Sequence, residues 1–221
     1  MKDQDDIEVI KTRDGSSSLY LKKLNETYHS VHGATIEAFY VFIERGLYEV
    51  MSNNHHIALL EIGFGTGLNA LLSCMKSSDK DVHIQYTSLE TRPLDWKILS
   101  ELSYSKLDQK LFKRIHESPW NASHEIEEHF HLNKIHVAVQ DFHAQEGRYN
   151  LIYFDAFGPQ AQEEMWTPEI FQKMYDVLSP GGILVTYCAK GQVRRDLESC
   201  GFNVERLPGP PGKREMLRAT K

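Results

Sequence analysis

The chain has 221 residues, 41% of them hydrophobic, and a formal net charge of −6 at pH 7. This length suits one well-buried domain, because domains usually run to roughly 100 to 200 residues. No run approaches the 18 or so apolar residues of a membrane span, and the start lacks the apolar centre of a signal peptide, so we expect a cytoplasmic protein without a membrane partner. The acidic balance argues against non-specific coating of nucleic acid, which draws on Lys and Arg.

Short apolar and β-branched runs alternate with longer segments of helical period, which is typical of an α/β domain with a mostly parallel sheet. We expect a single domain over residues 1–221, in which residues 1–30 form an extension that the pattern does not assign. The predicted strands, in chain order, are Ile57–Glu61, His83–Leu89, Ile135–Val139, Leu151–Phe154, Ile183–Tyr187, Phe202–Leu207 and Glu215–Ala219. The last two flank "PGPPGKR", which is too short for a crossover helix, so they should form an antiparallel hairpin.

The predicted helices are Thr35–Tyr48, Leu68–Lys76 and Thr167–Leu178, with two or three more between the second and third strands, including amphipathic "LDQKLFKRI". The third helix opens with "TPE", a favourable N-cap and first turn, and "SPGG" should close it. The segment "HSVHG" before the first helix is interpreted as packing.

The stretch "LEIGFGTGLNA" places three glycines, Gly63, Gly65 and Gly67, between a predicted strand and a predicted helix. Such a turn suits an anion or nucleotide, because a helix N-terminus presents free N–H groups and glycine permits close approach. A dinucleotide fingerprint would need glycine where Leu68 stands, and no GK[ST] follows, which excludes a P-loop. A less anionic nucleoside ligand fits better.

Acids follow at the ends of the next three predicted strands. Glu90 can accept hydrogen bonds from ribose hydroxyls, and Asp141 with Phe142 can offer an acceptor and an apolar face to a purine. Asp155 ends the apolar run "LIYF", where a carboxylate is costly unless something partners it. Because the carboxyl ends of parallel strands meet at one sheet edge, these acids and the glycine turn together predict an S-adenosylmethionine site.

Glu61, directly before the glycines, suits a cofactor that carries a sulfonium and an ammonium group. The predicted cofactor set is Glu61, Gly63, Phe64, Gly65, Gly67, Asn69, Glu90, Thr91, Asp141, Phe142 and Asp155. No metal is expected: the histidines of "HEIEEH" are five apart and would fall on different faces of a helix. The three cysteines form no CxxC.

Beyond residue 30 the chain resembles the methyltransferase half of the bifunctional tRNA 5-methylaminomethyl-2-thiouridine biosynthesis enzymes, which is also found as a stand-alone enzyme. The resemblance is carried by "GATIEAFYVFIERGL", "LEIGFGTGLNALL", "YTSLETRPL", "FDAFGPQAQEEMWTPEIFQKM", "LSPGG", "GQVRRDLESCGF" and "GPPGKREML". It implies a Rossmann-like class I methyltransferase that uses S-adenosylmethionine and methylates the aminomethyl group of 5-aminomethyl-(2-thio)uridine at the tRNA wobble position. The oxidase half has no counterpart in the chain, so we expect no FAD, methylation alone, and a separate oxidase acting upstream.

The resemblance also implies that Asp155 lies beside the departing methyl group and the accepting amine. The segment from Lys190 to Lys221 contains eight basic and four acidic residues. The resemblance places Arg194, Arg195, Lys213 and Arg214 in a basic patch that contacts the anticodon region of tRNA. Phe157 and Trp166 are candidates to receive the splayed base.

Three alternatives stay open. An aminopropyltransferase of similar fold would need further acids to hold a polycationic amine, and "FDAFGPQAQ" offers one. A methyltransferase acting on a small amine or a protein would share the cofactor residues. A nucleotide-binding module without catalysis would tolerate replacement of Asp155 by Asn.

Overall fold

The computed structural model describes residues 6–80, 82–104 and 107–221. Its centre is an eight-stranded sheet in the order β10-β11-β9-β8-β4-β5-β7-β6. The strands are β4 (His56–Ile62), β5 (His83–Glu90), β6 (Ser123–Glu127), β7 (Phe130–His136), β8 (Tyr149–Phe154), β9 (Leu178–Thr186), β10 (Asn203–Pro208) and β11 (Glu215–Thr220). Neighbours from β9 to β7 are parallel, whereas β6, β10 and β11 pair antiparallel. The predicted α/β fold with a C-terminal antiparallel hairpin is confirmed.

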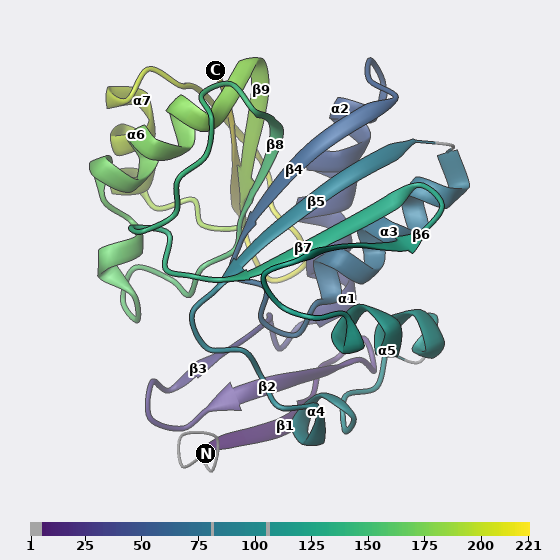
Figure 1. Cartoon of the computed structure of the whole chain (residues 1–221). Coiled ribbons are helices and arrows are strands. Elements are labelled where there is room, and N and C mark those ends of the chain that lie inside the picture. The colour runs from purple at the N-terminus through teal and green to yellow at the C-terminus, as the bar shows by residue number, and fades with distance from the viewer. Residues whose placement is uncertain (1–5, 81, 105–106) are drawn as a thin grey trace.

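Helices cover both faces of this sheet (Figure 1). One face carries a continuous helical run of α1 (Ala34–Ala38), the π-helical η1 (Phe39–Leu47) and α2 (Tyr48–Met51), together with α3 (Leu68–Lys80). The other face carries α6 (Pro168–Val177) and α7 (Gly191–Ser199). Strand β8 shows why both faces need cover: Leu151 and Tyr153 belong to one apolar core, and Ile152 and Phe154 belong to the other. A strand buried on both faces is apolar throughout, as "LIYF" is.

The third predicted strand, Ile135–Val139, was placed too late, and β6 was not predicted. In the observed β7, buried Phe130, Leu132 and Lys134 alternate with half-buried residues, so a lysine interrupts the apolar pattern of the buried face. Lys134 is nevertheless buried, because its Nζ donates to the carbonyls of Ile115 and His116 at the end of α5 (Gln109–Glu117), at 2.9 and 3.0 Å. Cations stabilise helix C-termini in this way.

Two predicted boundaries also shift. The helix predicted over Thr167–Leu178 ends at Val177, and "SPGG" lies in β9 rather than in a helix cap, at a register shift opposite β8. The segment "HEIEEH" begins in β6 rather than in a helix.

Within the described ranges, no group of three or more His, Cys, Asp or Glu is placed to hold a metal ion, and no helix is long and apolar enough to cross a membrane.

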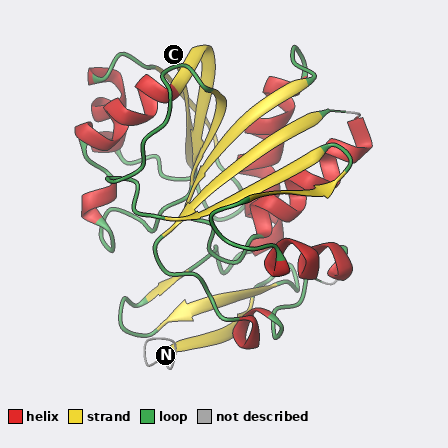
Figure 2. Cartoon of the chain, viewed as in Figure 1, coloured by secondary structure: helices red, strands yellow, loops and turns green. Residues whose placement is uncertain are grey.

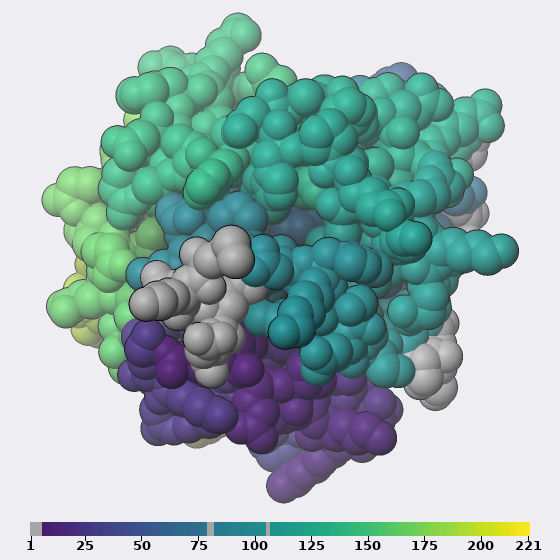
Figure 3. All heavy atoms as spheres, turned by 60° about the horizontal axis from the view of Figure 1, so that its bottom comes forward, coloured from purple at the N-terminus to yellow at the C-terminus, as the bar shows by residue number. Residues whose placement is uncertain are grey.

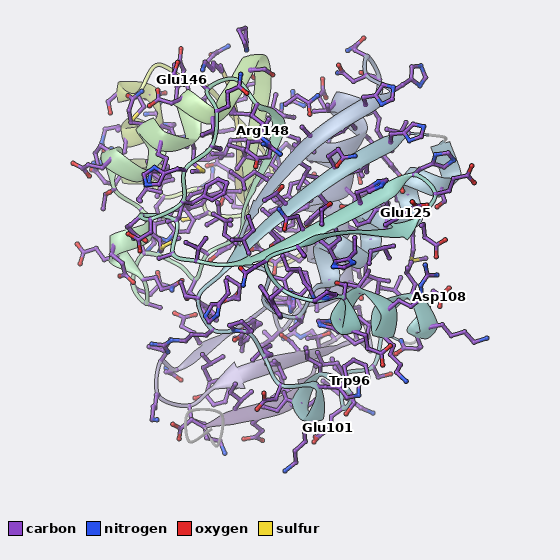
Figure 4. The ribbon with its side chains drawn as sticks, in the orientation of Figure 1. Trp96, Glu101, Asp108, Glu125, Glu146 and Arg148 are labelled. Atoms are coloured by element: carbon purple, nitrogen blue, oxygen red, sulfur yellow. The ribbon has the colours of Figure 1, made fainter. Side chains whose placement is uncertain are left out.

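The N-terminal extension forms a second sheet of three antiparallel strands, β1 (Ile7–Lys11), β2 (Ser17–Leu21) and β3 (Glu26–Thr27). Coloured by element type, the chain shows this sheet apart from the central one, with the short helix α4 (Trp96–Leu99) beside it (Figure 2). In the side-chain view, Trp96 lies at α4 and Asp108 at the start of α5, where its carboxylate accepts from the Lys110 and Leu111 amides (Figure 4). Glu146 and Arg148 lie at the opposite end of the molecule.

Candidate active site

A cavity of about 680 Å³ opens at the carboxyl ends of β4, β5 and β8. Three backbone hydrogen bonds hold these strand ends together: the Gly63 and Phe64 amides donate to the Leu89 carbonyl, and the Asp155 amide donates to the Ile62 carbonyl. This is the edge where ligands bind in open parallel sheets. The strand order therefore brings residues from positions 62–69, 89–92 and 155–157 around one space.

The glycine turn connects β4 to α3 and forms the floor of this cavity. Gly63 has a φ of 92°, and a Cβ there would lie 2.8 Å from the carbonyl oxygen of Asp155. The first glycine is thus required by the protein's own backbone, whether or not a ligand is bound. The turn also places the beginning of α3, with Leu68 and Asn69, against the cavity.

Glu90 lies at the tip of β5 and lines the cavity, as the sequence predicted. Its Oε2 accepts from the Gly65 amide at 3.0 Å and its Oε1 accepts from the Arg92 amide at 2.8 Å. These bonds fix the carboxylate, and each oxygen keeps a lone pair for a further donor. Thr91 also lines the cavity.

Asp155 follows β8 and lines the cavity from the opposite side of the turn. Its Oδ2 accepts from the Asn69 side chain at 2.8 Å, which joins two residues of the predicted cofactor set. Burial, reinforced by Glu37 and opposed by Asn69 and Lys213, raises the pKa of Asp155 to about 7. A carboxyl group whose pKa is near neutral, inside a cavity, is suited to accepting hydrogen bonds or protons from a ligand.

A second carboxylate, that of Glu37 in α1, lines the same cavity and was not predicted. Its Oε2 accepts from the Ser30 amide at 2.7 Å, and its Oε1 lies 2.5 Å from the Lys213 ammonium. Lys213 Nζ also lies 3.8 Å from the centre of the Tyr187 ring. Glu37 sits in a helix whose neighbours read as ordinary packing residues, so only its place in the "GATIE" segment of the resemblance could have singled it out.

The N-terminal sheet covers the mouth of the cavity. Residues from β2 to Val31 contribute to its lining, and the ring of Tyr28 meets that of Phe157 edge-to-face, with centres 5.0 Å apart. His29, within "HSVHG", is half-buried and bonded to Ser18, so it packs as predicted and also lines the cavity. The space-filling view shows the N-terminal segment, in purple, packed against later segments of the chain (Figure 3). The segment before Val31 is rich in polar residues, so the sequence did not indicate that it lines the cavity.

Several predicted residues lie outside the lining. Glu61 is buried behind the turn, where Ser88 Oγ donates to its Oε2 at 2.6 Å, and burial raises its pKa to about 8. Gly67 is part of the turn but does not line the cavity. Asp141 is exposed and Phe142 is packed in the core, because β7 ends earlier than predicted. Residues 137–140 line the cavity instead.

The predicted substrate residues separate into two groups. Phe157 lines the cavity, whereas Trp166 is a core residue whose Nε1 donates to the Phe157 carbonyl at 2.7 Å and so supports that loop. Lys213 lies in the cavity wall, and Arg214 lines a neighbouring groove of about 390 Å³. Arg194 and Arg195, on α7, line neither, and Arg194 pairs with Glu198 at 2.6 Å.

The charges of the lining suit a cationic ligand. Five carboxylates line the cavity against two basic side chains, Arg92 and Lys213; the carboxylates are Glu26, Glu37, Glu90, Asp155 and Glu164. A polyphosphate would be repelled here, whereas a sulfonium with an ammonium group is favoured. The fixed Glu90 carboxylate suits a ribose, and the volume suits a nucleoside-sized ligand. The residues present therefore fit S-adenosylmethionine.

Comparison with known proteins agrees with this chemistry. A family described as S-adenosyl-L-methionine-dependent methyltransferase matches residues 103–221, more than half of the chain. The tRNA 5-methylaminomethyl-2-thiouridine biosynthesis bifunctional protein MnmC of Pseudomonas savastanoi pv. phaseolicola is 27% identical over 216 residues, covering 90% of this chain and 32% of that protein. The same-named protein of Cupriavidus necator is 28% identical over 215 residues, covering 91% and 32%. The chain thus spans about a third of the length of these relatives.

Solved structures share the fold. MnmC2 from Aquifex aeolicus superimposes with a TM-score of 0.81 at 22% identity, covering 97% of this chain and 69% of that one. Spermidine synthase from Thermotoga maritima gives a TM-score of 0.61 at 13% identity, covering 97% and 68%. The resemblance to the bifunctional tRNA 5-methylaminomethyl-2-thiouridine biosynthesis enzymes, drawn from the sequence motifs, is confirmed by the two relatives of that name. Together with the cavity and its charges, the family match means that the chain belongs to the S-adenosyl-L-methionine-dependent methyltransferases.

Proposed function

We propose that this protein methylates the aminomethyl nitrogen of 5-aminomethyluridine, with or without a 2-thio group, at the wobble position of tRNA. The observation that carries the proposal is the placement of Asp155 in the cavity lining, anchored by Asn69 and beside the glycine turn, with Glu90 on the other side of β4. The relatives named for 5-methylaminomethyl-2-thiouridine biosynthesis support this choice of substrate. A tRNA substrate would place the enzyme in the cytoplasm, and the precursor would come from a separate oxidase.

When bound, S-adenosylmethionine supplies an activated methyl group on a sulfonium sulfur. Gly63, Gly65, Glu90 and Asn69 would hold it, with the Glu90 carboxylate accepting from the ribose. Asp155 would accept a hydrogen bond from the substrate amine and orient its lone pair. Because the methyl donor is already activated, alignment is the protein's main task, and it can contribute roughly 7 to 11 kcal/mol.

The amine must react in its neutral form, although an alkyl amine is largely protonated at neutral pH. Burial in the cavity disfavours the ammonium, and the Asp155 carboxylate can receive the proton because its pKa is raised to about 7. The wobble base must leave its stack to enter, and Phe157, in the lining beside Tyr28, offers an aromatic surface for it.

The test is incubation of the pure protein with radiolabelled S-adenosylmethionine and bulk tRNA from cells that lack the activity, followed by nucleoside mass spectrometry. We expect label in 5-methylaminomethyl nucleosides, and loss of that label with Asp155→Ala. If tRNA stays unlabelled while a small amine accepts the methyl group, the methyltransferase assignment survives and the tRNA assignment falls. If Asp155→Asn methylates as fast as the natural protein, the role of Asp155 is wrong.

Aminopropyl transfer stayed open as an alternative from the sequence, although "FDAFGPQAQ" offers one acid and a polycationic amine needs more. Glu37 adds a second carboxylate beside Asp155 in the cavity, from a distant part of the chain. What still separates the two reactions is Lys213, which pairs with Glu37 and leaves a smaller net negative charge for the substrate.

A further inference from the structure

We propose that Lys213 is a specificity-determining residue: its ammonium fills a second ammonium-binding position in the cavity, and thereby restricts the acceptor to an amine with one cationic group. This inference rests on the proposed function, in which the acceptor is a single primary amine. It goes further in assigning the position taken by Lys213 Nζ as a binding site in its own right.

The surroundings of Lys213 Nζ are those of a bound ammonium ligand. A carboxylate oxygen of Glu37 lies 2.5 Å away, and the centre of the Tyr187 ring lies 3.8 Å away. A carboxylate combined with an aromatic face is a common receptor for ammonium groups, since one supplies charge and the other supplies its quadrupole. The Lys213 side chain is 29% exposed, so this pairing is partly shielded from water.

Glu37 and Tyr187 are also held in place by contacts that do not involve Lys213. The Ser30 amide donates to Glu37 Oε2 at 2.7 Å, and the Tyr187 hydroxyl donates to the Ala156 carbonyl at 2.8 Å. Glu37 is buried, with a relative exposure of 7%. Shortening Lys213 would leave this carboxylate and ring in position without their cation, and an incoming ammonium could take its place.

The receptor lies close enough to Asp155 to act on it. Glu37 raises the pKa of Asp155 and Lys213 lowers it, after the larger effect of burial, and all of these groups line the same cavity. With Lys213 present, Glu37 is already paired, and Asp155 is the carboxylate left for one substrate ammonium. Without Lys213 both carboxylates are open to the acceptor, which matches a diamine. Specificity of this kind comes from occupying the position that a competitor needs.

The experiment measures binding of amines by titration calorimetry in the presence of S-adenosylhomocysteine, so that no turnover is needed. The probes are butylamine and a series of α,ω-diamines with three, four and five carbons, which also measures the spacing between the two sites. The variants are Lys213→Met, the charge-preserving Lys213→Arg, and the double variant Lys213→Met with Glu37→Gln. Lys110→Met, an exposed lysine on α5, is the matched control. Thermal unfolding checks that each variant folds, and Lys213→Gln replaces Lys213→Met if the latter does not.

We expect Lys213→Met to bind its best diamine at least about tenfold more tightly than the natural protein does, because an ammonium–carboxylate contact is gained. Butylamine should gain less than about threefold, since its single ammonium can occupy the Asp155 site or the Glu37 site but not both. Lys213→Arg and Lys110→Met should behave like the natural protein, and Glu37→Gln in the double variant should abolish the gain. A Lys213→Met protein that folds but gains no diamine affinity overturns the inference, as does a gain that survives Glu37→Gln.

Failure of the proposed function would look different. If the natural protein does not methylate tRNA but Lys213→Met still gains diamine affinity through Glu37, the ammonium site stands and the tRNA assignment falls. If the natural protein methylates tRNA and the variants show no change in diamine affinity, the proposed function stands and the role of Lys213 is wrong.

Discussion

Asp155 shows how one residue depends on four separate places along the chain. Its amide is bonded to β4, its carboxylate to Asn69 at the start of α3, and its charge is influenced by Glu37 and Lys213 from opposite ends of the chain. None of these partners lies within 60 residues of Asp155 except Lys213. The strand-end position is local information, but the chemistry of the residue is set by contacts made only in the folded protein.

The first prediction concerns pH. Because burial raises the pKa of Asp155 to about 7, its ionised fraction grows as pH rises through that value, and we expect kcat/KM to rise with it. The fraction of neutral, reactive substrate amine also grows as pH rises, which raises kcat/KM further. Asp155→Asn cannot accept the proton, and it should lower kcat by about 100-fold or more at every pH. Initial rates from about pH 5 to pH 9 test this; a natural enzyme that is fastest at the acid end would contradict it.

The second prediction compares two glutamates. Glu90 faces the cavity and is fixed by two backbone amides, so Glu90→Ala should weaken S-adenosylmethionine binding by at least about tenfold through loss of a charge-assisted hydrogen bond. Glu61 is buried behind the turn, and Glu61→Gln keeps an acceptor for Ser88, so affinity should change by less than about threefold. Calorimetric titration of both variants is the measurement. Equal losses would mean that the two residues have been distinguished wrongly.

At the scale of elements, the turn between β4 and α3 determines the shape of the site. Gly63→Ala would place a Cβ at 2.8 Å from a backbone oxygen in addition to its unfavourable φ of 92°. Gly181→Ala, at a φ of 76° with open space around it, carries only the conformational cost of about 1 to 2 kcal/mol. We expect Gly63→Ala to cost at least about 2 kcal/mol more than Gly181→Ala. Urea unfolding of the two variants measures the difference, and equal costs would show that the turn relaxes easily.

The central strands could be predicted because they contain runs of apolar residues, and the acids Glu90 and Asp155 mark the ends of two of them. Strands β4, β5 and β8 were located to within a few residues, and with them Glu90 and Asp155. Strand β7 was misplaced because Lys134 breaks its apolar pattern, and its burial depends on helix carbonyls that the sequence does not reveal. Asp141 and Phe142, predicted at the end of that strand, lie outside the cavity lining.

The N-terminal cover could not be predicted from periodicity. Its strands are short, of two to five residues, and they pair in a sheet of their own. Residues such as Tyr28 become cavity residues only once the chain folds back over the glycine turn. Glu37 was missed for the same reason, since a glutamate in an amphipathic helix is usually an exposed residue.

At the scale of the whole molecule, the C-terminal basic segment is less available than its composition suggested. Four of its eight basic residues are paired with carboxylates: Arg194, Arg206, Lys213 and Arg218. Lys221 Nζ donates to the Tyr175 carbonyl. In the part of the chain that the structure describes, Lys190, Arg195 and Arg214 have no carboxylate within ion-pair distance, although Lys190 and Arg195 are bonded to glutamine side chains.

A prediction about tRNA binding follows. If three cations contact phosphates, the plot of log K against log salt should have a slope of about −2 to −3. Lys190→Gln and Arg214→Gln should each reduce the magnitude of that slope by about one unit. Filter binding of tRNA at several salt concentrations measures it. A slope steeper than about −6 would mean that the paired arginines open to bind tRNA as well.

The proposal that this cavity methylates a wobble aminomethyl group can be tested with one paired measurement. A single tRNA is prepared with either 5-aminomethyluridine or plain uridine at the wobble position, and each form is incubated with labelled S-adenosylmethionine under single-turnover conditions. We predict label only in the aminomethyl form, recovered as 5-methylaminomethyluridine. Equal labelling of both forms, or labelling of neither alongside rapid methylation of a free amine, would contradict the claim.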